Sequence, residues 1–278
     1  MLQALIQAWL AEDIGAGDHS TMAAISPDAL GTANLLVKEK AVIAGLRIAS
    51  EIYRITDPKA EITWFKKDGD FIVPGDIAFI VKGNARNILS TERLILNCMQ
   101  RMSGIATQTN VLTQKIAHTK TRLLDTRKTT PGFRLLEKEA VKIGGGLNHR
   151  YGLYDMIMLK DNHIDFCGGI TQAVNKVKAY QLKNKLHLPI EVEVRNEIEL
   201  MEAIKLEGVQ RIMLDNFSPA LIEKLIHLIP EHFEIEASGG ITEQNIVSYA
   251  ESGVHFISVG ALTHHVKSID MSLKALIH

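Results

Sequence analysis

The sequence predicts an α/β protein in which an α+β segment precedes a series of parallel strand–helix units. In the first third, β-branched and aromatic runs are broken by Asp-Gly and Pro-Gly dipeptides. In the second half, short apolar runs alternate with helix-like segments at a regular spacing. Turn dipeptides favour short antiparallel strands, whereas regular alternation is typical of parallel sheets and most economically of a (β/α) barrel.

The chain begins with MLQALIQAWLAEDI, which we interpret as an amphipathic helix. Its apolar run lacks the basic start of a signal peptide and is followed at once by Glu12 and Asp13. Residues 32–45 and 62–83 then predict antiparallel strands. A lipoyl-like carrier module is an alternative for the second range, but the lysine pair begun by Lys66 precedes the turn, which favours a structural hairpin.

Residues 90–110 predict a helix, with Ser90 as its N-cap and apolar side chains at helical spacing. Arg93, Asn97 and Arg101 line the opposite face of this helix. Solvation is the simplest interpretation of that polar face, so the pattern alone assigns these side chains no function.

Six apolar runs in the second half are expected to form strands. Helix-like segments separate the last four runs, with start signals at Asn196, at Ser218-Pro219 and at Thr242. The runs cover residues 123–126, 156–160, 190–194, 211–215, 234–238 and 256–260.

Each run ends in a residue able to do chemistry, and the last four such residues are separated by 22, 23 and 22 positions. In (β/α) barrels the active site lies at the carboxyl ends of the strands. Solvated loops also carry polar residues, but not one functional type after another at a fixed period, so the pattern favours a site. The residues are Asp125, Lys160, Glu193, Asp215, Ser238 and Gly260.

Cations cluster near these strand ends. Guanidiniums suit bidentate recognition of carboxylate or phosphate and lysines act as point charges, so several in one pocket predict a polyanionic ligand. Spread over a surface, the same residues would mean little. They are Arg127, Lys128, Arg134, His149, Arg150 and Lys160.

Glu193 and Asp215 are expected at adjacent strand ends. Carboxylates beside a cationic pocket suit Mg²⁺ carrying a pyrophosphate or hydrogen bonds to ribose hydroxyls, and charge balance is the alternative. His149 fits a base, a hydrogen-bond donor to a ligand or a buried structural histidine. Contact with a ligand is preferred because Arg150 adjoins it.

Two glycine-bearing turns predict a phosphate site. Residues 238–240 (SGG) precede the helix expected at Thr242, and residues 259–262 (VGAL) follow one unit later. Backbone N–H groups at a helix N-terminus bind phosphate, and the last two strands of phosphosugar-handling barrels provide such sites. A third glycine run at residues 144–146 permits close approach to either a ligand or a helix, and the sequence leaves both open.

Composition excludes several classes of protein. The formal net charge of −1 gives no overall basic field for nucleic acid, and no apolar run approaches the roughly 18 residues of a membrane span. Cys98 and Cys167 define neither a disulfide framework nor a metal-ligand spacing, which favours the reducing cytoplasm. We therefore expect a soluble protein that binds small molecules and neither nucleic acid nor membrane.

The residues at these strand ends resemble the quinolinate phosphoribosyltransferase family, also called the nicotinate-nucleotide pyrophosphorylases. DTRKTTPGFRLLEKEAVKIGGGLNHRYGLYDMIMLKDNHI (125–164) is similar to the family's central signature. AEDIGAGDHST, STERLILNCMQRMSGIAT, IEVEV, IMLDN, ASGGI and ISVGALTH resemble it too, in the family's order, so the resemblance covers nearly the whole chain. Ile143 and Asp161 depart from the usual pattern without removing a charged site residue.

The resemblance implies an N-terminal α/β sandwich, residues 1–108, followed by an incomplete parallel (β/α) barrel, residues 109–264. It implies that residues 265–278 pack back on the first domain and that the protein is an obligate homodimer, with higher assembly left open. The implied reaction joins quinolinate to phosphoribosyl pyrophosphate, giving nicotinate mononucleotide, pyrophosphate and carbon dioxide in de novo NAD biosynthesis. Mg²⁺ is the implied cofactor.

The resemblance also implies site roles. Glu193 is preferred to Glu191 by motif position, although both face the same side of one strand and the face does not separate them. Arg134 receives no role. The expected catalytic residues are Lys128, Lys160, Glu193 and Asp215; the expected substrate-binding set adds Arg127, His149 and Arg150 for the quinolinate carboxylates, Arg93 from the partner subunit, and Ser238, Gly239, Gly240 and Gly260 for the 5′-phosphate. Glu193 and Asp215 are expected to hold Mg²⁺ indirectly, through pyrophosphate or water.

Two alternatives are weighed against this assignment. Molybdenum-transport-associated homologues of the same fold keep a TRKT-PG stretch but tend to lose the NHR and K-[DE]-N-H patterns, which are intact at residues 148–150 and 160–163. A non-catalytic phosphosugar-binding barrel does not need a full set of Arg, His and Lys beside two acidic strand ends.

Overall fold

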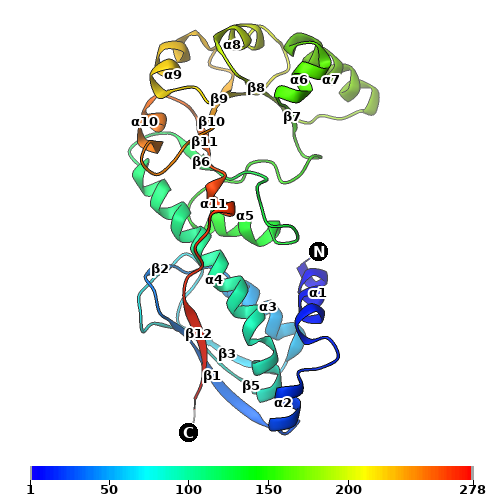
Figure 1. The fold of residues 1–278 in the computed structure, drawn as a ribbon, viewed down its shortest axis with the longest axis vertical. Coiled ribbons are helices and arrows are strands. Elements are labelled where there is room, and N and C mark those ends of the chain that lie inside the picture. Colours follow the sequence, from blue (N-terminus) through cyan, green and yellow to red (C-terminus); the bar gives the residue numbers. More distant parts are fainter. Residues whose placement is uncertain (1, 277–278) are drawn as a thin grey trace. The chain divides into compact units, whose positions relative to one another are not determined.

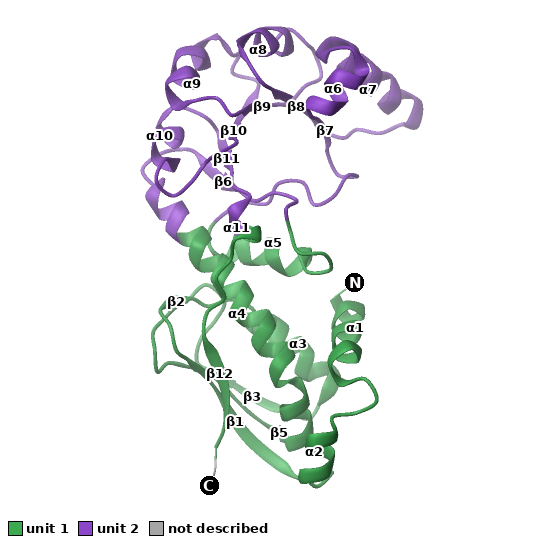
Figure 2. Cartoon of the chain, viewed as in Figure 1, with its two compact units in different colours: residues 1–110, 129–145, 263–278 green, residues 111–128, 146–262 purple. Residues whose placement is uncertain are grey.

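The computed structural model describes residues 2–276, which divide into two compact units (Figure 2). The division differs from the predicted domains at residues 129–145, which lie within the predicted barrel domain but belong to unit 1. Met1 and the last two residues of the predicted C-terminal segment, 265–278, lie outside the described residues. Unit 1 comprises residues 2–110, 129–145 and 263–276, and unit 2 comprises residues 111–128 and 146–262.

Unit 1 is built on a four-stranded antiparallel sheet in the order β12-β1-β5-β3 (Figure 1). Its turns use Gly69 and Gly75, whose φ angles of 96° and 94° favour glycine, as the Asp-Gly and Pro-Gly dipeptides predicted. The C-terminal strand pairs with β1, so the end of the chain returns to the N-terminal fold. The strands are β1 (Leu30–Val37), β3 (Glu61–Trp64), β5 (Ile77–Asn84) and β12 (Met271–Ala275), with a separate pair of β2 (Ala41–Val42) and β4 (Phe71–Ile72).

Helices pack on this sheet through apolar and polar contacts. Tyr53 of α3 meets Phe79 of β5 edge-on, with ring centroids 6.4 Å apart. Gln100 of α4 donates a hydrogen bond to the Met271 carbonyl of β12 at 3.1 Å. These contacts give the α/β sandwich that the resemblance implied. The helices with residues in unit 1 are α1 (Leu2–Ile14), α2 (His19–Ala24), α3 (Leu46–Thr56), α4 (Ala85–Lys115), α5 (Arg134–Ile143) and α11 (Ala261–His264).

The helix predicted over residues 90–110 is longer than expected, because α4 begins at Ala85. Asn84, rather than Ser90, satisfies its first turn: Asn84 Oδ1 accepts the backbone N–H of Arg86 at 3.0 Å. Ser90 lies inside the helix, and its hydroxyl donates to Asp18 at 3.0 Å. Even α4 is unsuited to a bilayer, since no helix among the described residues has the length and apolarity to cross one.

Unit 2 contains a six-stranded parallel sheet in the order β6-β11-β10-β9-β8-β7, and all six strand predictions are confirmed. The strands curve into a barrel-like ring in Figure 1. The edge strands β6 and β7 do not pair with each other, so the barrel is incomplete. The strands are β6 (Arg122–Leu124), β7 (Ile157–Leu159), β8 (Ile190–Val194), β9 (Arg211–Asp215), β10 (Glu234–Ser238) and β11 (Phe256–Ser258).

A segment without regular secondary structure lies at the seam between β6 and β7. Leu147 forms an isolated parallel bridge with Leu124 at the end of β6. Arg150 Nη1 donates to the carbonyl of Met156, which directly precedes β7, at 3.2 Å. Residues 147–156, which we call the seam segment, therefore pair with the end of β6 and lead directly into β7.

Two of the three predicted helix starts in unit 2 are confirmed. Asn196 caps α8, and Ser218 caps α9 with Pro219 at the first helical position. The third prediction is wrong, because α10 begins at Ile246; the residues from Thr242 onward form a turn that the Asn245 side chain closes. The helices are α6 (Asp161–Cys167), α7 (Ile170–Asn184), α8 (Glu197–Ala203), α9 (Pro219–Leu225) and α10 (Ile246–Glu251), with a 3₁₀ turn at Ile226–Leu228.

Candidate active site

The carboxyl edge of the parallel sheet collects the six predicted strand-end residues, with Asp125 directly after β6. Asp215 ends β9 and lies in register with Ser238, which ends β10. Glu193 is the penultimate residue of β8, Lys160 directly follows β7, and Gly260 lies just beyond β11. Parallel strands end at one edge, so the structure presents these groups together.

Glu193 combines a nearby cation with a nearby carboxylate. Its Oε2 lies 3.4 Å from Lys160 Nζ, and its side chain is 9% exposed against 48% for that of Lys160. Burial raises the pKa of Glu193; the positive charge of Lys160 opposes this rise and the negative charge of Asp215 adds to it. Glu193 and Asp215 therefore repel each other at this edge, and a ligand that brings positive charge relieves the repulsion.

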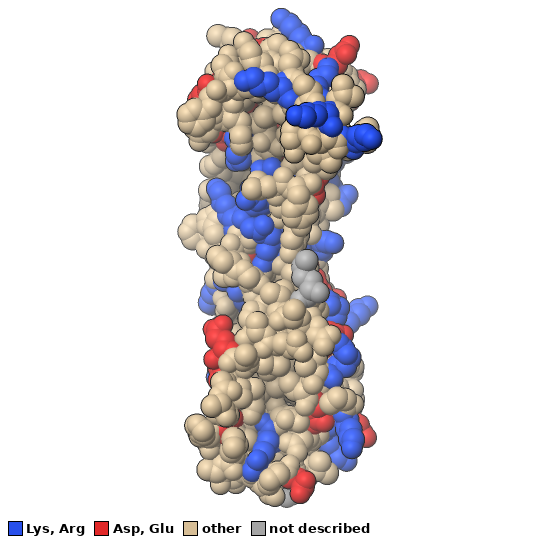
Figure 3. Space-filling model, turned by 90° about the vertical axis from the view of Figure 1, so that its right-hand side faces the viewer, with Lys and Arg blue, Asp and Glu red and all other residues tan. Residues whose placement is uncertain are grey.

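Two guanidiniums also lie close enough to repel. Burial lowers the pKa of Arg150, and the charge of Arg127 lowers it further. Arg127 Nε is buried and has no hydrogen-bond partner among the described residues. Such a pair, with a buried donor unsatisfied, favours an anionic ligand. On the face shown in Figure 3, Lys and Arg side chains gather in patches.

His149, predicted to contact a ligand, has a buried ring. Its Nε2 lies 3.0 Å from Glu191 Oε2 and 3.4 Å from Glu236 Oε2, and both carboxylates are fully buried. Burial lowers the pKa of His149, but these carboxylates outweigh burial and raise the pKa to about 9. The N–H of Arg150 approaches Nδ1 at 2.6 Å, which suits a neutral ring. Backbone and side-chain torsions alone can bring these atoms of adjacent residues this close, so the two buried carboxylates at Nε2 weigh more in the protonation of the ring.

Sequence reasoning assigned no role to Glu191 or to Glu236, and it missed Arg211. Arg211 Nη1 lies 3.2 Å from Glu236 Oε2. Burial raises the pKa of Glu236, but His149, with a smaller contribution from Arg211, brings it below its ordinary value. A signal was available in the strand sequences, because IEVEV and EIEAS repeat glutamate at every second position and so place the glutamates on one face of a strand. Every residue of β8 is buried, so a glutamate there faces the interior and needs a partner.

The predicted phosphate turn differs from the expected one. Because α10 begins at Ile246, the Ser-Gly-Gly run precedes a turn rather than a helix N-terminus. Gly239 has a φ of 90°, and a Cβ there would overlap the Asn216 side chain, so only glycine fits. Around Gly240 no described atom lies within 4 Å of a Cβ position, which leaves space beside the turn. Asn245 Nδ2 donates to the Gly240 carbonyl at 3.1 Å and holds the turn.

The polar face of α4 is not simply solvated. Arg101 Nε donates to Glu137 Oε1 at 2.7 Å, and Arg101 Nη2 donates to Thr130 Oγ1 at 3.0 Å. Glu137 is fully buried and also accepts the Thr130 N–H at 3.0 Å. Arg134 Nε donates to Thr129 Oγ1 at 2.9 Å. These contacts fix the residues that follow the Arg127-Lys128 pair, whereas Arg93 on the same helix is exposed.

The structure resolves the meaning of the glycine run at residues 144–146. A Cβ at Gly144 would overlap the Ala106 carbonyl and lie 2.7 Å from Thr109 Cβ, both on α4. The run therefore permits close packing against a helix, which is one of the two readings that the sequence left open.

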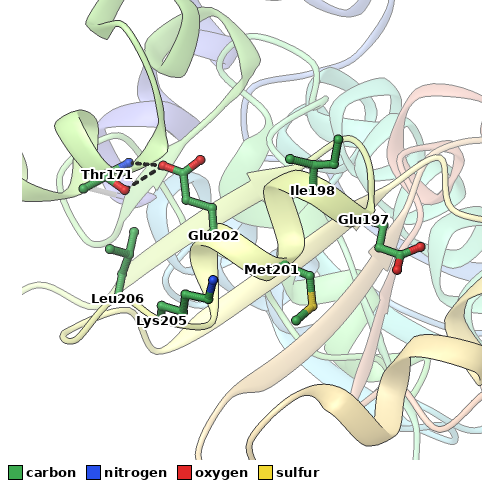
Figure 4. Close-up of a pocket in the computed structure, with 7 residues that line it drawn as sticks. All are labelled: Thr171, Glu197, Ile198, Met201, Glu202, Lys205 and Leu206. Carbon is green, nitrogen blue, oxygen red and sulfur yellow. Dashed lines mark hydrogen bonds between the residues drawn. The ribbon is translucent and has the colours of Figure 1, made fainter.

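A separate pocket of about 570 Å³ lies at the start of α7 and along α8 (Figure 4). It contains none of the predicted site residues. Its Glu202 accepts hydrogen bonds from the Thr171 N–H and hydroxyl at 2.9 and 2.6 Å, so this carboxylate is already occupied.

Comparison with known families agrees with this arrangement. Residues 18–103 match the model described as quinolinate phosphoribosyl transferase, N-terminal domain, and residues 105–274 match the corresponding C-terminal domain. The chain belongs to the quinolinate phosphoribosyltransferase family.

Relatives in the family carry the pyrophosphorylase name. The chain is 44% identical over 288 residues to the chloroplastic nicotinate-nucleotide pyrophosphorylase (carboxylating) of Oryza sativa subsp. japonica, covering 98% of this chain and 77% of that protein. It is 41% identical to the probable nicotinate-nucleotide pyrophosphorylase (carboxylating) of Bacillus subtilis, covering 98% and 92%. These names favour the enzyme over the molybdenum-transport and non-catalytic alternatives.

Solved structures in the family share the fold. The nicotinate-nucleotide pyrophosphorylase from Francisella tularensis superposes with a TM-score of 0.91 at 42% identity, covering 99% of this chain and 96% of that one. NadC from Streptococcus pyogenes gives a TM-score of 0.92 at 37% identity, covering 99% and 97%. The α/β class, with an antiparallel N-terminal sheet and a parallel barrel-like sheet, is thereby confirmed.

Proposed function

We propose that the protein transfers the phosphoribosyl group of phosphoribosyl pyrophosphate to the ring nitrogen of quinolinate, releasing pyrophosphate and carbon dioxide and yielding nicotinate mononucleotide for NAD biosynthesis. The observation that carries the proposal is electrostatic. Unit 2 holds two mutually repelling guanidiniums, and the carboxyl edge of its sheet holds two mutually repelling carboxylates. A pyridine dicarboxylate satisfies the first pair, and a metal-bound pyrophosphate with its ribose satisfies the second.

Arg127 and Arg150 hold the two carboxylates of quinolinate. The buried Nε of Arg127 gains the acceptor that it lacks among the described residues. His149 adds positive charge beside Arg150, supported by a pKa raised to about 9 by Glu191 and Glu236 despite burial. Lys128, whose side chain is exposed, serves anionic groups near the reacting centre.

Glu193 and Asp215 position the ribose and the Mg²⁺-pyrophosphate. Their carboxylates are the oxygen donors that Mg²⁺ prefers, and their mutual repulsion fits a site that receives a cation. They hold the metal through pyrophosphate or water. When bound, Mg²⁺ neutralises negative charge on the leaving pyrophosphate. Lys160, 3.4 Å from Glu193, offers a second positive charge to the substrates' anionic groups.

The 5′-phosphate lies against the glycine turns. Ser238 and the two glycines after it offer a hydroxyl and backbone N–H groups, and the open space at Gly240 leaves room for a phosphate. Gly260 directly precedes α11 and supplies the second turn.

The chemistry then needs positioning and electrostatics rather than a covalent enzyme intermediate. The quinolinate nitrogen bonds to the ribose C1 as the C1–O bond to pyrophosphate breaks, and Glu193 and Asp215 stabilise the positive charge that develops on the ribose. The new pyridinium then accepts the electron pair of the breaking ring–carboxylate bond. Carbon dioxide leaves, and a proton replaces it on the ring carbon.

The proposed enzyme is a homodimer in which Arg93 of one subunit completes the quinolinate site of its partner. Arg93→Ala and Arg127→Ala subunits, each with little activity alone at quinolinate concentrations near the wild-type KM, are expected to restore activity when mixed, because some sites in the heterodimer carry both arginines. Native mass spectrometry verifies subunit exchange, and a verified heterodimer without activity contradicts the shared site. The cytoplasm remains the predicted location, supported by the free thiols of Cys98 and Cys167.

Direct assay tests the activity. Purified protein with quinolinate, phosphoribosyl pyrophosphate and Mg²⁺ is expected to form nicotinate mononucleotide and pyrophosphate in equal amounts. Nicotinate, which lacks the second carboxylate, is the matched control and is expected to give no product. Absence of product above a boiled control, or equal use of nicotinate, rejects the proposed function.

A further inference from the structure

The interior of the incomplete barrel carries charge where barrels of this class usually hold branched apolar side chains. Glu191 and Glu236 are fully buried, and the side chain of His149 is 4% exposed. Removing ionised groups from water costs several kcal/mol each unless they are paired. Arg211, 12% exposed, pairs with Glu236, and His149 lies against both carboxylates.

The members of this buried cluster come from four elements. Glu191 lies on β8, Arg211 on the neighbouring β9 and Glu236 on β10, and all three strands belong to one hydrogen-bonded sheet. Glu191 and Arg211 are register partners. His149 is the one member of the four that does not lie on a strand, because it belongs to the seam segment.

The seam segment depends on side chains for its conformation. Beyond the Leu147 bridge, no strand pairing holds its described residues. Asp125 accepts the His149 N–H at 2.8 Å, and Asp155 accepts the N–H groups of Tyr151 and Gly152 at 2.6 and 2.9 Å. These anchors lie within the segment or beside β6. The His149 ring is an anchor that reaches strands in the middle of the sheet.

We propose that Glu191 and Glu236 are positioning residues for the dicarboxylate site, which grip the His149 ring in the barrel interior and so hold Arg150, the next residue, where it meets its substrate. The identity of that substrate rests on the proposed function, whereas the grip itself does not. The Arg150 guanidinium donates to the Met156 carbonyl just before β7, so movement of His149 displaces a guanidinium that is held at the β7 end of the seam segment.

The charge balance supports the same grip. With both carboxylates ionised, the cluster is neutral when His149 is an imidazolium, because Glu191 and Glu236 then face the two cations His149 and Arg211. A carboxamide in place of either carboxylate keeps the shape of the cluster and removes one charge. The charged groups around His149 are Glu191 from β8, Arg211 from β9, Glu236 from β10 and Asp125 beyond β6. Arg150 is the next residue in the chain, and the charge of Arg127 acts on Arg150.

The test compares Glu191→Gln and Glu236→Gln with Glu234→Gln. Glu234 is the matched control: it lies on the same strand as Glu236 and also pairs with Arg211, at 2.7 Å, but it is 50% exposed and makes no contact with His149. NMR titration measures the pKa of the His149 imidazole, whose signal is assigned by its disappearance in His149→Gln. This measurement tests the contact with the two carboxylates and needs no enzymatic activity. Steady-state kinetics report the KM for quinolinate and for phosphoribosyl pyrophosphate separately.

Both buried variants are expected to lower the pKa of His149 by at least about 1, since an opposite charge at this distance raises a histidine pKa by that amount or more. They are expected to raise the KM for quinolinate about 10- to 100-fold, by analogy with the loss of residues that orient metal ligands, which costs about that much in affinity or activity. The KM for phosphoribosyl pyrophosphate and all parameters of Glu234→Gln stay unchanged. Glu236→Asp, which restores the charge, recovers part of the lost affinity.

An unchanged quinolinate KM in well-folded glutamine variants overturns the proposal, as does an unchanged His149 pKa. If a glutamine variant does not fold, the wild-type titration decides, and a His149 pKa at or below 6.5 overturns the grip. His149, Glu191 and Glu236 each offer one atom able to bind a metal ion, and these atoms lie within 4.8 Å of one another. The titration is therefore repeated with EDTA. A His149 pKa that changes on chelation indicates a bound metal in place of the ion pairs and overturns the proposal. If the wild type forms no nicotinate mononucleotide, the proposed function fails while the titration still tests the grip.

Discussion

The buried imidazolium makes the stability of the protein depend on pH in a direction that the structure fixes. His149 has a pKa of about 9 in the folded chain, against 6.5 for an ordinary histidine, because Glu191 and Glu236 outweigh its burial. At 1.36 kcal/mol for each pH unit, that difference is worth about 3 kcal/mol of unfolding free energy. The folded pKa lies above the unfolded one, so this contribution is complete below pH 6.5 and is lost as the pH rises through about 9.

The perturbation is His149→Gln, which keeps a polar side chain but cannot titrate. Urea unfolding of both proteins, followed by circular dichroism from below pH 6.5 to above pH 9, gives the difference in unfolding free energy at each pH. Both tryptophans, Trp9 and Trp64, lie in unit 1, so their fluorescence follows the unfolding of that unit. The part of the circular dichroism change that fluorescence does not follow is assigned to unit 2.

The wild type is expected to lose about 3 kcal/mol relative to the variant across this range, and only in the transition of unit 2. Titration of any other group cancels in the difference as long as its pKa is the same in both proteins. A difference that stays flat, or one that grows as the pH rises, refutes the charged-histidine assignment.

Three further predictions follow from single contacts. Arg127→Ala removes a charged donor, so steady-state kinetics should show a KM for quinolinate raised by about 10- to 100-fold with the KM for phosphoribosyl pyrophosphate little changed; equal effects on both would contradict a carboxylate role. Gly239→Ala should lower the unfolding free energy by about 1–3 kcal/mol because it meets both a positive φ and the Asn216 side chain. Gly240→Ala also meets a positive φ, of 62°, but has open space and should lower it less; a reversed order in thermal melting rejects this account. Arg101→Met leaves the buried carboxylate of Glu137 without its positive partner and should lower the free energy of urea unfolding by about 3–5 kcal/mol. Arg54→Met, which breaks the exposed pair with Glu51, is its control and should cost less than about 1 kcal/mol.

The regular part of the fold could be read from local chemistry. Strand runs in unit 2 are short, apolar and evenly spaced, and Ser218-Pro219 starts α9 where its hydroxyl and fixed φ predict a start. The helix starts that failed did so for a local reason. Asn84 competes with Ser90 as the cap of α4, and Asn245 closes a turn that delays α10.

The candidate site was predictable where position along a strand decided it. Lys160, Glu193 and Asp215 come to one edge because parallel strands end together, and spacing shows that. The fate of Arg101 was not predictable, because its partner Glu137 lies on another helix and the sequence does not say which faces meet.

The class of the fold, the edge that carries the site and the family can all be recognised in the sequence, because strand periodicity and the central signature are local properties of the chain. The contents of the barrel interior follow from tertiary packing instead. Glu191 and Glu193 occupy the same face of β8, yet one lies against a buried histidine and the other against Lys160 at the rim. The distance of a residue from the carboxyl edge of the sheet separates a buried positioning charge from one that faces the substrate. That distance is defined only once the strands have assembled into a sheet.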